Sequence, residues 1–496
     1  MMRWLICAAM FLYLTMTLAV SAAAAEPNER PNIVFILIDD MGYADLACYG
    51  SDFNETPNID RLAQNGLRFT CAYSAGPVCS PTRAALVTGQ YPVRSGITDF
   101  IAGDNPTIWL DPARYVTINE PLQQVGYTTC HLGKWHLDGG HAAGLGAPTR
   151  HGFDRVIGSE TAFIGLGYYL FPYKHVSTFT EPVAKNPWLS GDEKEYLMDR
   201  LFYEAIGFMK QNKDEPFFVN LCLYSVHTDF EAPDRLVEKY IAKYEKRFGE
   251  GSGAPFRRRA NGHRAPWTEI NNAGIARNCE PVLAAMVQNI DENIGKLVDT
   301  LAAMGELDNT LIVVMSDNGG LPVNNNGGLR EGKSWLYEGG IRVPLIMHWP
   351  KGIKPGGETD VPVNVIDMYP TFAELAGAAL PKDQPMDGES LAGLMRDGKP
   401  LQRQELYWHY GAPSANWVNR KATAIRQGNW KCIHWYAGRR PRVELFNLKD
   451  DPFEKHDLSQ TNPQKRLELM ARIEAWRKEC GVDIEKGLPD FPHPGQ

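Results

Sequence analysis

Four runs of consecutive hydrophobic residues occur along this chain, and each has the pattern of a strand that is buried on both faces. Residues 32–38 (NIVFILI) end abruptly in two aspartates, and residues 311–315 (LIVVM) are followed by a serine, an aspartate and an asparagine. The segments 215–227 (EPFFVNLCLYSVH) and 341–350 (IRVPLIMHWP) contain the other two runs. Continuous apolar, β-branched runs of this length are typical of strands in a parallel sheet.

Between these runs, hydrophobic residues recur at every third or fourth position, which predicts helices. The clearest helix covers residues 283–301 and stops at Gly305. A shorter one is predicted for residues 56–66 (TPNIDRLAQNG), with Thr56 as its N-cap, a proline in its first turn and Gly66 at its end. Strands that alternate with helices predict an α/β fold: a large mixed, mostly parallel sheet with helices on both faces.

The C-terminal part of the chain has a different pattern. Short strand-like pieces follow one another with tight links at residues 405–410, 421–427, 430–436 and 443–448, and a last helix is predicted around Pro463 to Cys480. This order predicts a smaller domain with an antiparallel sheet and one helix. We therefore divide the chain into a signal peptide (residues 1–25), a larger domain (26–389) and a smaller α+β domain (390–496).

The N-terminus has the pattern of an export signal. Arg3 is its one positive charge, residues 5–20 are apolar, and the small residues SAAAA precede Glu26, so we predict cleavage after Ala25. An uncleaved membrane anchor is the alternative. No later segment approaches the ~18 uninterrupted apolar residues of a membrane span. We therefore expect an exported protein, periplasmic or secreted, with no membrane contact after cleavage.

The charge and the cysteines narrow the class of function. A formal net charge of −8 argues against a general nucleic-acid binder, but a local basic pocket could still hold an anionic substrate. Eight cysteines remain after signal removal, scattered and without a C-x-x-C pair, so neither a zinc knuckle nor a dense disulfide framework is indicated. Whether any of these cysteines form disulfides stays open.

Acidic and amide side chains follow two of the predicted buried strands. They are Asp39, Asp40, Asp317 and Asn318. Ligands bind beyond the carboxyl ends of parallel strands, and a Ca²⁺ ion takes six to eight oxygen ligands at ~2.3–2.6 Å. The sequence therefore indicates a site for one hard divalent cation, although solvated loop acids remain the alternative.

Several basic side chains could bind an anionic substrate beside such a metal ion. They are Arg83, Lys134, His136, His227 and Lys333. Basic groups beside a metal point to a tetrahedral oxyanion, whose charge they stabilise as it develops. Each lysine or arginine taken alone is equally consistent with a solvated side chain, and His227 with a core histidine.

A phosphate-loop pattern also occurs, at residues 327–334 (GGLREGKS). Its context does not fit, because such a loop should leave a strand directly and open a helix. Here three asparagines precede the pattern, and two glycines follow within six residues. We therefore reject a nucleotide site.

The residues around Cys79 resemble a known family. Residues 77–89 (PVCSPTRAALVTG) resemble the sulfatase signature, in which Cys-x-Pro-x-Arg precedes a short apolar run and Thr-Gly. Residues 126–136 (GYTTCHLGKWH) are similar to the second sulfatase signature, except that Leu132 stands where a smaller residue is commoner. The segments DDMGYADLACYG, SDNGG, YEGGIRVPLI and VIDMYPTFAELAG are also similar to sulfatase segments, in the expected order. The resemblance covers roughly Asn32 to Glu479.

This resemblance implies a formylglycine-dependent sulfatase of the arylsulfatase type, within the alkaline phosphatase superfamily. In that family a separate formylglycine-generating enzyme, which reads Pro81 and Arg83, oxidises the motif cysteine to an aldehyde. One hydroxyl of the hydrated aldehyde attacks sulfur, and the other then ejects sulfate by carbon–oxygen cleavage. Cys79 would thus be the precursor of the nucleophile.

The same resemblance assigns roles to the other residues. One Ca²⁺ would be held by Asp39, Asp40, Asp317, Asn318 and the modified Cys79. Arg83 would stabilise the hydrate, while Lys134, His227 and Lys333 would bind the sulfate oxygens. Lys134 or His227 would help the leaving group. His136 would orient and deprotonate a hydroxyl of formylglycine. Pro81 suits the first turn of a helix, which would place residue 79 at a positive helix end that favours an anion.

Two alternatives remain. A phosphodiesterase or phosphonate hydrolase of the same superfamily usually has a Thr or Ser nucleophile and two transition metals with added His ligands. Neither acidic cluster has a histidine beside it in the sequence, which favours one hard cation. A catalytically silent glycan-binding protein would keep Cys79 as a thiol, but it has no need of the nucleophile motif.

The family's exported members act mainly on sulfated carbohydrates, so we expect a substrate of that class. The aromatic residues Tyr168, Tyr169, Phe171 and Tyr173 could stack on sugar rings or belong to the core. Trp408 to Tyr410 could form a wall of the pocket, contributed by the smaller domain. Which sugar and which sulfate position, exo or endo action, and the oligomeric state all stay open.

Overall fold

The core of the structure is a nine-stranded sheet with the strand order β10-β2-β9-β8-β1-β7-β3-β4, and β11 pairs with β2 beside β10. The computed structural model describes residues 30–101, 108–139, 144–160, 169–171, 176–177, 195–228, 230–257, 279–322, 324–411, 419–436, 442–482 and 484. The strands of this sheet are β1 (Asn32–Ile38), β2 (Leu67–Tyr73), β3 (Thr128–Gly133), β4 (Arg155–Ile157), β7 (Phe217–Cys222), β8 (Thr310–Ser316), β9 (Arg342–His348), β10 (Gly357–Thr359) and β11 (Val363–Asn364).

The sheet is parallel except around β9. β1 pairs in parallel with both β7 and β8, and β3 does so with β7 and β4, whereas β9 runs antiparallel to its neighbours β8 and β2. The carboxyl ends of β8, β1, β7 and β3, which are consecutive in the sheet, therefore lie along one edge. This edge is where the candidate site forms.

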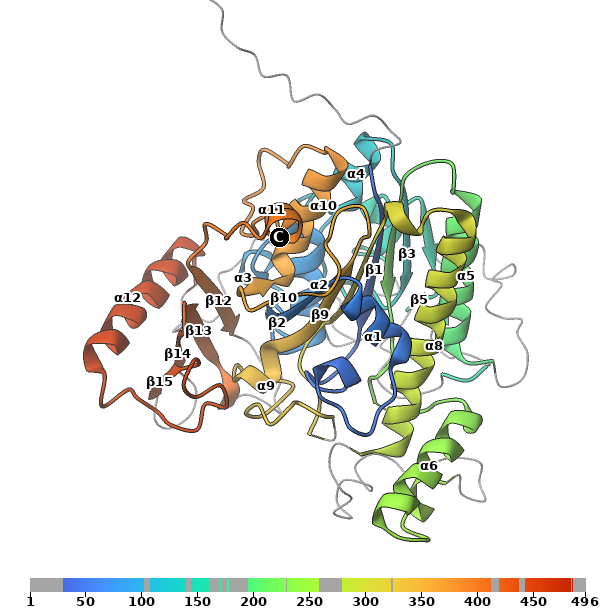
Figure 1. Ribbon diagram of the computed structural model, residues 1–496. Helices are drawn as coiled ribbons and strands as arrows, with labels where there is room; N and C mark the ends of the chain where they lie inside the picture. The colour runs from blue at the N-terminus through green and yellow to red at the C-terminus, as the bar shows by residue number, and fades with distance from the viewer. Residues whose placement is uncertain are drawn as a thin grey trace, which may run out of the picture.

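Side chains of β1 alternate between two hydrophobic cores, because successive residues of a strand point to opposite faces. Val34 and Ile36 belong to one core, whereas Ile33 and Phe35 belong to the other. Figure 1 shows the helices on both faces of the sheet. The first core is closed by α1 (Pro57–Gln64), α5 (Leu197–Gln211), α6 (Asp234–Phe248) and α8 (Pro281–Met304). The second is closed by α2 (Cys79–Thr88), α3 (Pro92–Ser95), α4 (Asn119–Gln124), α10 (Met368–Ala376) and α11 (Ala392–Asp397).

A second, four-stranded antiparallel sheet lies beside the large one (Figure 1). It consists of β12 (Glu405–Tyr410), β13 (Ala422–Gln427), β14 (Trp430–Trp435) and β15 (Arg442–Asn447). The helix α12 (Pro463–Glu479) packs through Ile473 and Trp476 into the core that also contains Ile425 and Cys432. Trp408 and Trp435 pack instead with Tyr73 at the end of β2 and with Tyr337, beside the short helix α9 (Glu338–Ile341). A small two-stranded sheet pairs β5 (Ser159–Glu160) with β6 (Val176–Ser177).

The predicted fold class is confirmed: a mostly parallel sheet flanked by helices, with a separate antiparallel sheet and a C-terminal helix. The predicted start of the short helix is confirmed, because Thr56 is the N-cap residue of α1 and Pro57 lies in its first turn. The Thr56 hydroxyl does not cap the helix backbone and donates instead to Asp60 at 2.9 Å. The helix ends at Gln64, two residues before the predicted Gly66. The domain boundaries stay predictions, and the signal peptide lies outside the described residues. Within the described part of the chain, no helix combines the length and the apolarity needed to cross a bilayer.

Candidate active site

The sequence-predicted site residues come from four neighbouring strand ends, one helix and one further segment of the chain. β1 is followed by Asp39 and Asp40, β8 by Asp317 and Asn318, β3 by Lys134, and β7 by a short loop that reaches His227, while Cys79 and Arg83 lie on α2. Lys333 comes from the segment between β8 and α9. These residues meet because the carboxyl ends of parallel strands share one edge of the sheet.

Asp39 is the centre of the first group of contacts. Its Oδ2 lies 2.5 Å from Lys134 Nζ, its Oδ1 lies 3.5 Å from Cys79 Sγ, and Arg83 is 3.8 Å away. Burial alone would raise the pKa of this fully buried carboxyl. The positive charges of Lys134, Arg83 and Lys333, joined by that of His227 at low pH where its ring is protonated, nonetheless hold the pKa of Asp39 far below its ordinary range. Asp39 is therefore an anion in the folded protein.

Asp40 is the centre of the second group. Its two carboxylate oxygens lie 2.7 and 2.8 Å from Lys333 Nζ, and its Oδ1 also accepts a 2.7 Å hydrogen bond from Asn318 Nδ2. His227 Nε2 lies 3.7 Å from Oδ2. Lys333 Nζ is in turn 3.7 Å from Cys79 Sγ, so this lysine links Asp40 to the candidate nucleophile.

Asp317 connects the two groups. Its Oδ2 accepts from Nε and Nη2 of Arg83 at 3.1 and 2.7 Å, and its Oδ1 accepts from the backbone N–H of Asp40 at 3.2 Å. Arg83 also donates to the carbonyl of Lys134 at 2.7 Å, so one guanidinium links three strand ends. Burial, with the charge of Asp39 added, raises the pKa of Asp317 to about 7. Three carboxylates thus share one buried volume, and such a set favours an added cation.

Cys79 is the first residue of α2, and Val78 precedes the helix without a side-chain cap. The N–H groups of the first helical turn therefore direct partial positive charge toward residue 79. Cys79 is 2% exposed, and burial, with the charge of Asp39, raises the pKa of its thiol to about 12. As sulfur, this residue would be protonated at neutral pH and a poor nucleophile. All eight cysteines of the described residues are free thiols.

The two predicted site histidines differ in their exposure. The His136 ring is buried with Nε2 2.9 Å from the carbonyl oxygen of Ile101, and burial lowers its pKa well below the ordinary value. Its charged neighbours are Lys134, Arg83 and Asp39. His227 is 15% exposed at its side chain, with Nδ1 2.7 Å from the Thr228 carbonyl, and burial together with Lys333 lowers its pKa. Both rings are therefore neutral near pH 7.

Two glycines allow the Lys333 segment to lie against the end of β8. The backbone N–H of Gly319 donates to the carbonyl of Gly340 at 3.0 Å. A Cβ at Gly319 would lie 1.9 Å from the Gly339 oxygen, and one at Gly340 would lie 2.0 Å from the Trp335 oxygen. The motifs SDNGG and YEGG thus carry glycine because their backbones touch.

The oxygen donors of this site fit a hard cation. Ligand atoms of Asp39, Cys79 and Asp317 lie within 4.8 Å of one another, and so do those of Asp40, Cys79 and His227. Oδ1 of the fully buried Asn318 has no hydrogen-bond partner among the described residues, although its amide nitrogen donates to Asp40. A buried acceptor of this kind is costly unless a ligand satisfies it. His227 also lies close to Asp40 in space, although no histidine adjoins either acidic cluster in the sequence.

Several supporting residues were not predicted. Asp45 accepts from the backbone N–H of Gly42 at 2.7 Å and from Asn324 Nδ2 at 2.8 Å, and Asn324 also donates to the carbonyl of Asp40. Asp45 thus holds the turn in which Asp40 adopts a φ of 61°. Only the spacing in DDMGYAD pointed to this residue, and a lone aspartate in a loop carries little information.

The expected aromatic contributions are only partly described. Tyr168 and Tyr173 lie outside the described residues. Tyr169 is 1% exposed and donates to the carbonyls of Tyr224 and His227, so it belongs to the core. Trp408 and Tyr410 are also buried, and Tyr410 donates to Asp99 at 3.0 Å. These side chains pack between the two sheets rather than forming an open wall.

Comparison with known proteins gives consistent matches over nearly the whole chain. A family model described as Sulfatase matches residues 31–378, and one described as N-sulphoglucosamine sulphohydrolase, C-terminal, matches residues 331–479. A protein named Sulfatase from Formosa agariphila is 30% identical, covering 92% of this chain and 91% of its own. Arylsulfatase A of Homo sapiens is 32% identical over 86% and 78% of the two chains. The crystal structure of Ps i-CgsB in complex with k-i-k-neocarrahexaose is 30% identical, with a TM-score of 0.73 and coverage of 90% and 92%.

Proposed function

The chain belongs to the sulfatase family and is a sulfuric ester hydrolase, and we propose that it removes sulfate from a sulfated carbohydrate. Two of the matches support this substrate class. One family model is named for N-sulphoglucosamine, and one solved relative is described in complex with a neocarrahexaose. We further propose that residue 79 acts as formylglycine and that one Ca²⁺ completes the site.

The position of Cys79 carries the proposal of a modified residue. Its sulfur lies 3.5 Å from Asp39 and 3.7 Å from Lys333, in a site where burial raises the pKa of the thiol to about 12. A thiol in this state is inert, whereas formylglycine would supply an oxygen nucleophile at the same place. Cys79, Pro81 and Arg83 are all buried. A formylglycine-generating enzyme would therefore have to read them before the chain folds.

The donor set supports the proposal of calcium. Asp39, Asp40, Asp317 and the orphaned Oδ1 of Asn318 offer hard oxygen ligands of the type that Ca²⁺ prefers. Such a cation would supply Lewis-acid stabilisation of negative charge at residue 79 and at the sulfate. Arg83 would fix Asp317 and Lys134 would fix Asp39, through the contacts of 2.7 and 2.5 Å.

The basic residues would bind and protonate the substrate. Lys333 and His227, 10% and 15% exposed at their side chains, reach the solvent side and would meet sulfate oxygens first. Lys134 is 4% exposed, which places its ammonium deeper beside Asp39. Lys134 or His227 would give a proton to the leaving alcohol, and His136 would orient and deprotonate the nucleophile at residue 79.

Mass spectrometry of the tryptic peptide Phe69–Arg83 tests the modification. We expect the mass loss that accompanies replacement of the Cys79 thiol by an aldehyde. Cys71, in the same peptide, serves as an internal control: iodoacetamide should label one thiol per modified peptide and two per unmodified peptide. A fully active sample with two labelled thiols would refute formylglycine.

Metal removal tests the proposed Ca²⁺, and substrate screening tests the proposed sulfated-carbohydrate substrate. Dialysis against a chelator should abolish release of sulfate from defined sulfated oligosaccharides, and added Ca²⁺ should restore it. Full activity in excess chelator would contradict the cation. The alternative phosphodiesterase or phosphonate hydrolase predicts a higher kcat/KM on an aryl phosphate or phosphonate than on the matching aryl sulfate. A silent glycan-binding protein predicts turnover of neither.

The division at residue 389 and export through a signal at residues 1–25 also remain proposals. Edman sequencing of protein recovered from the periplasm or the medium would test export, and it should begin at Glu26. Recovery of intact Met1 in the cytoplasm would contradict it.

A further inference from the structure

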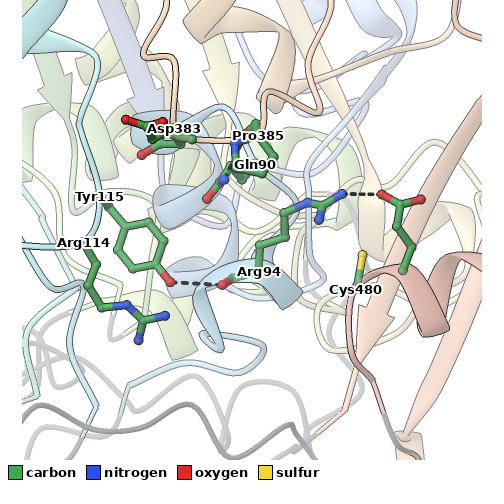
Figure 2. A pocket seen from close by; sticks show the side chains of 9 residues that line it. Gln90, Arg94, Arg114, Tyr115, Asp383, Pro385 and Cys480 are labelled. Atoms are coloured by element: carbon green, nitrogen blue, oxygen red, sulfur yellow. Dashed lines mark hydrogen bonds and ion pairs between the residues drawn. The ribbon is translucent and has the colours of Figure 1, made fainter.

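A pocket lies away from Cys79, where four parts of the chain meet. It is lined by residues of the turn and helix after α2, by Arg114 and Tyr115, by the segment around Gln384 and by the end of α12, and its volume is about 260 Å³. Figure 2 shows its lining residues from close by, among them Gln90, Arg94, Arg114, Tyr115, Asp383 and Cys480. The ten residues of α2 separate this pocket from Cys79 by about 15 Å, at ~1.5 Å per residue.

The side chain of Gln90 points to a ligand. Gln90 is 3% exposed, and its Nε2 donates to the carbonyl of Pro385 at 2.9 Å, which fixes the orientation of the amide. Its Oε1 is buried and has no hydrogen-bond partner among the described residues. Figure 2 shows this oxygen directed into the space between Tyr115 and Arg94. A flipped amide would set its oxygen against the Pro385 carbonyl, so the acceptor must face the pocket. The pocket therefore presents an acceptor that a hydrogen-bond donor, a water molecule or a ligand hydroxyl, would satisfy.

The charges around the pocket do not favour an anion. The guanidinium of Arg94 is already paired, since it contacts both oxygens of Asp387 at 2.8 to 3.0 Å and Oε1 of Glu479 at 2.8 Å. At the rim, the exposed Arg114 and Asp383 carry opposite charges. A sulfate or phosphate would therefore find no excess of positive charge in the pocket. Gln90 Oε1 could not donate a hydrogen bond to it either.

Neutral hydroxyl groups match this lining. A sugar hydroxyl can donate to Gln90 Oε1, while its oxygen or a neighbouring hydroxyl accepts from a guanidinium. The Tyr115 ring, whose hydroxyl donates to the Arg94 carbonyl at 3.0 Å, provides an apolar wall with the Arg114 guanidinium 5.5 Å from its centre. A volume of 260 Å³ equals that of about nine water molecules at ~30 Å³ each, which suits one monosaccharide unit.

We propose that this pocket is a second carbohydrate site, which binds one neutral pyranose residue. The site lies at the opposite end of α2 from the chemistry, so it would hold an unsulfated part of a glycan. This inference does not depend on the proposed formylglycine or calcium, because none of the residues that line the pocket belongs to the catalytic site.

Ligand-observed NMR with methyl β-galactoside and methyl β-glucoside tests the proposal. We expect saturable, millimolar binding of at least one of these sugars to the full mature protein, and the same binding to Lys333→Met, which alters the catalytic site alone. Gln90→Leu removes the orphaned acceptor and should weaken binding about fivefold or more. Arg114→Ala, at an exposed position where folding is not at stake, should weaken it about threefold. Inorganic sulfate should not compete.

Several results would overturn the proposal. The proposal fails if neither sugar binds saturably, or if sulfate displaces the bound sugar. It also fails if the single variants Gln90→Leu and Arg114→Ala each bind the sugar as tightly as wild type, or if Lys333→Met loses the binding. Far-UV circular dichroism and thermal melts of each variant report on folding. If Gln90→Leu fails to fold, Arg114→Ala decides the matter alone.

Discussion

Two clusters of buried charges lie at opposite ends of the segment from Lys333 to Glu338. The catalytic cluster consists of Asp39, Asp40, Cys79, Arg83, Lys134, Asp317, Asn318 and Lys333. The inter-sheet cluster consists of Tyr73, Glu338, Arg342, Arg426, Lys431 and Glu454, and it joins β2 and α9 to the small sheet. Both combine carboxylates with lysine and arginine in the protein interior, yet their bonding differs.

The inter-sheet cluster is closed. Lys431 Nζ, whose side chain is 0% exposed, lies 2.8 Å from both Glu338 Oε1 and Glu454 Oε1. The other carboxylate oxygens accept from the Tyr73 hydroxyl at 2.7 Å and from the Glu338 backbone N–H at 2.6 Å. Arg426 donates to Tyr73, and Arg342 lies 3.7 Å from Glu338. Each carboxylate oxygen of Glu338 and Glu454 has an ion-pair or hydrogen-bond partner within the cluster, so no acceptor remains to bind a ligand.

The catalytic cluster is open. Three aspartates share one volume, Asn318 retains an acceptor without a donor, and Lys333 reaches solvent. Buried charge alone therefore does not identify a functional site. Two features distinguish the catalytic cluster: the Asn318 Oδ1 acceptor, which has neither a hydrogen bond nor an ion pair among the described residues, and access from solvent through Lys333.

The largest expected effect comes from Cys79→Ala. We expect kcat to fall by about 10⁴-fold or more, because the nucleophile is lost, while the thermal midpoint changes little. Sulfate release and circular dichroism measure the two quantities. Cys71→Ala, at another buried free thiol, is the matched control and should keep its activity. Wild-type rates in Cys79→Ala would refute the nucleophile assignment.

The next largest effect belongs to the inter-sheet cluster and concerns stability alone. Lys431→Met leaves Glu338 without its nearest cation, and breaking a buried ion pair in this way costs about 3–5 kcal/mol. We expect urea unfolding to show this loss, while kcat/KM below the unfolding transition stays within about threefold of wild type. A loss of activity without a loss of stability would show that the cluster belongs to the site.

Lys333→Met should have the opposite effect to Lys431→Met: a loss of activity without a loss of stability. Lys333 stands at the mouth of the site, so its removal should lower kcat/KM by about 100-fold through lost stabilisation of sulfate charge. We expect the free energy of unfolding to stay within about 1 kcal/mol of wild type, since the lysine pairs with an aspartate that a bound cation would also neutralise. If Lys333→Met unfolds as readily as Lys431→Met, the contrast between the two clusters fails.

The proximity of the acidic and amide residues of this cluster could be predicted from the sequence, because their signals are local. Asp39, Asp40, Asp317 and Asn318 each follow a continuous apolar strand, so the strand pattern places them at one edge of a sheet before any contact is known. The bounds of β1 agree with the apolar run residue for residue. The residue roles within this cluster stay predictions.

The inter-sheet cluster could not be predicted, because its members are distant in sequence. Lys431 is 93 residues from Glu338, and Glu454 is 116 residues from it, so each reads alone as a solvated charge. β3 escaped prediction for a related reason. Its polar residues interrupt the apolar pattern, but Thr129 donates to Asp154, and His131 lies 3.1 Å from Asn220. Only tertiary contacts reveal that these polar groups are satisfied.

The smallest expected effect is a pH dependence of stability that arises in the inter-sheet cluster. Burial, opposed by Lys431 and reinforced by the charge of Glu338, raises the pKa of Glu454 from its ordinary 4.5 to about 7. Beyond Glu338, the charged groups nearby are Arg342 and Arg426, with the Tyr73 hydroxyl between them. Because its folded pKa exceeds the unfolded one, Glu454 binds a proton more tightly in the folded protein. This contribution to stability is fully present below about pH 4.5 and is lost as the pH rises through about 7.

Glu454→Gln carries no such proton, so its stability should lack this loss. We expect the free energy of unfolding of Glu454→Gln, relative to wild type, to rise by about 2.5 kcal/mol between about pH 5 and pH 8, measured as urea midpoints at constant m-value. Other buried carboxyls with raised pKa values, such as Asp45 and Asp291, contribute equally to both proteins and cancel in the difference. Glu468→Gln, on the exposed side of α12, should follow the wild-type profile. Parallel profiles for Glu454→Gln and wild type would mean that Lys431 keeps both glutamates ionised, and that a closed cluster can hold two full negative charges.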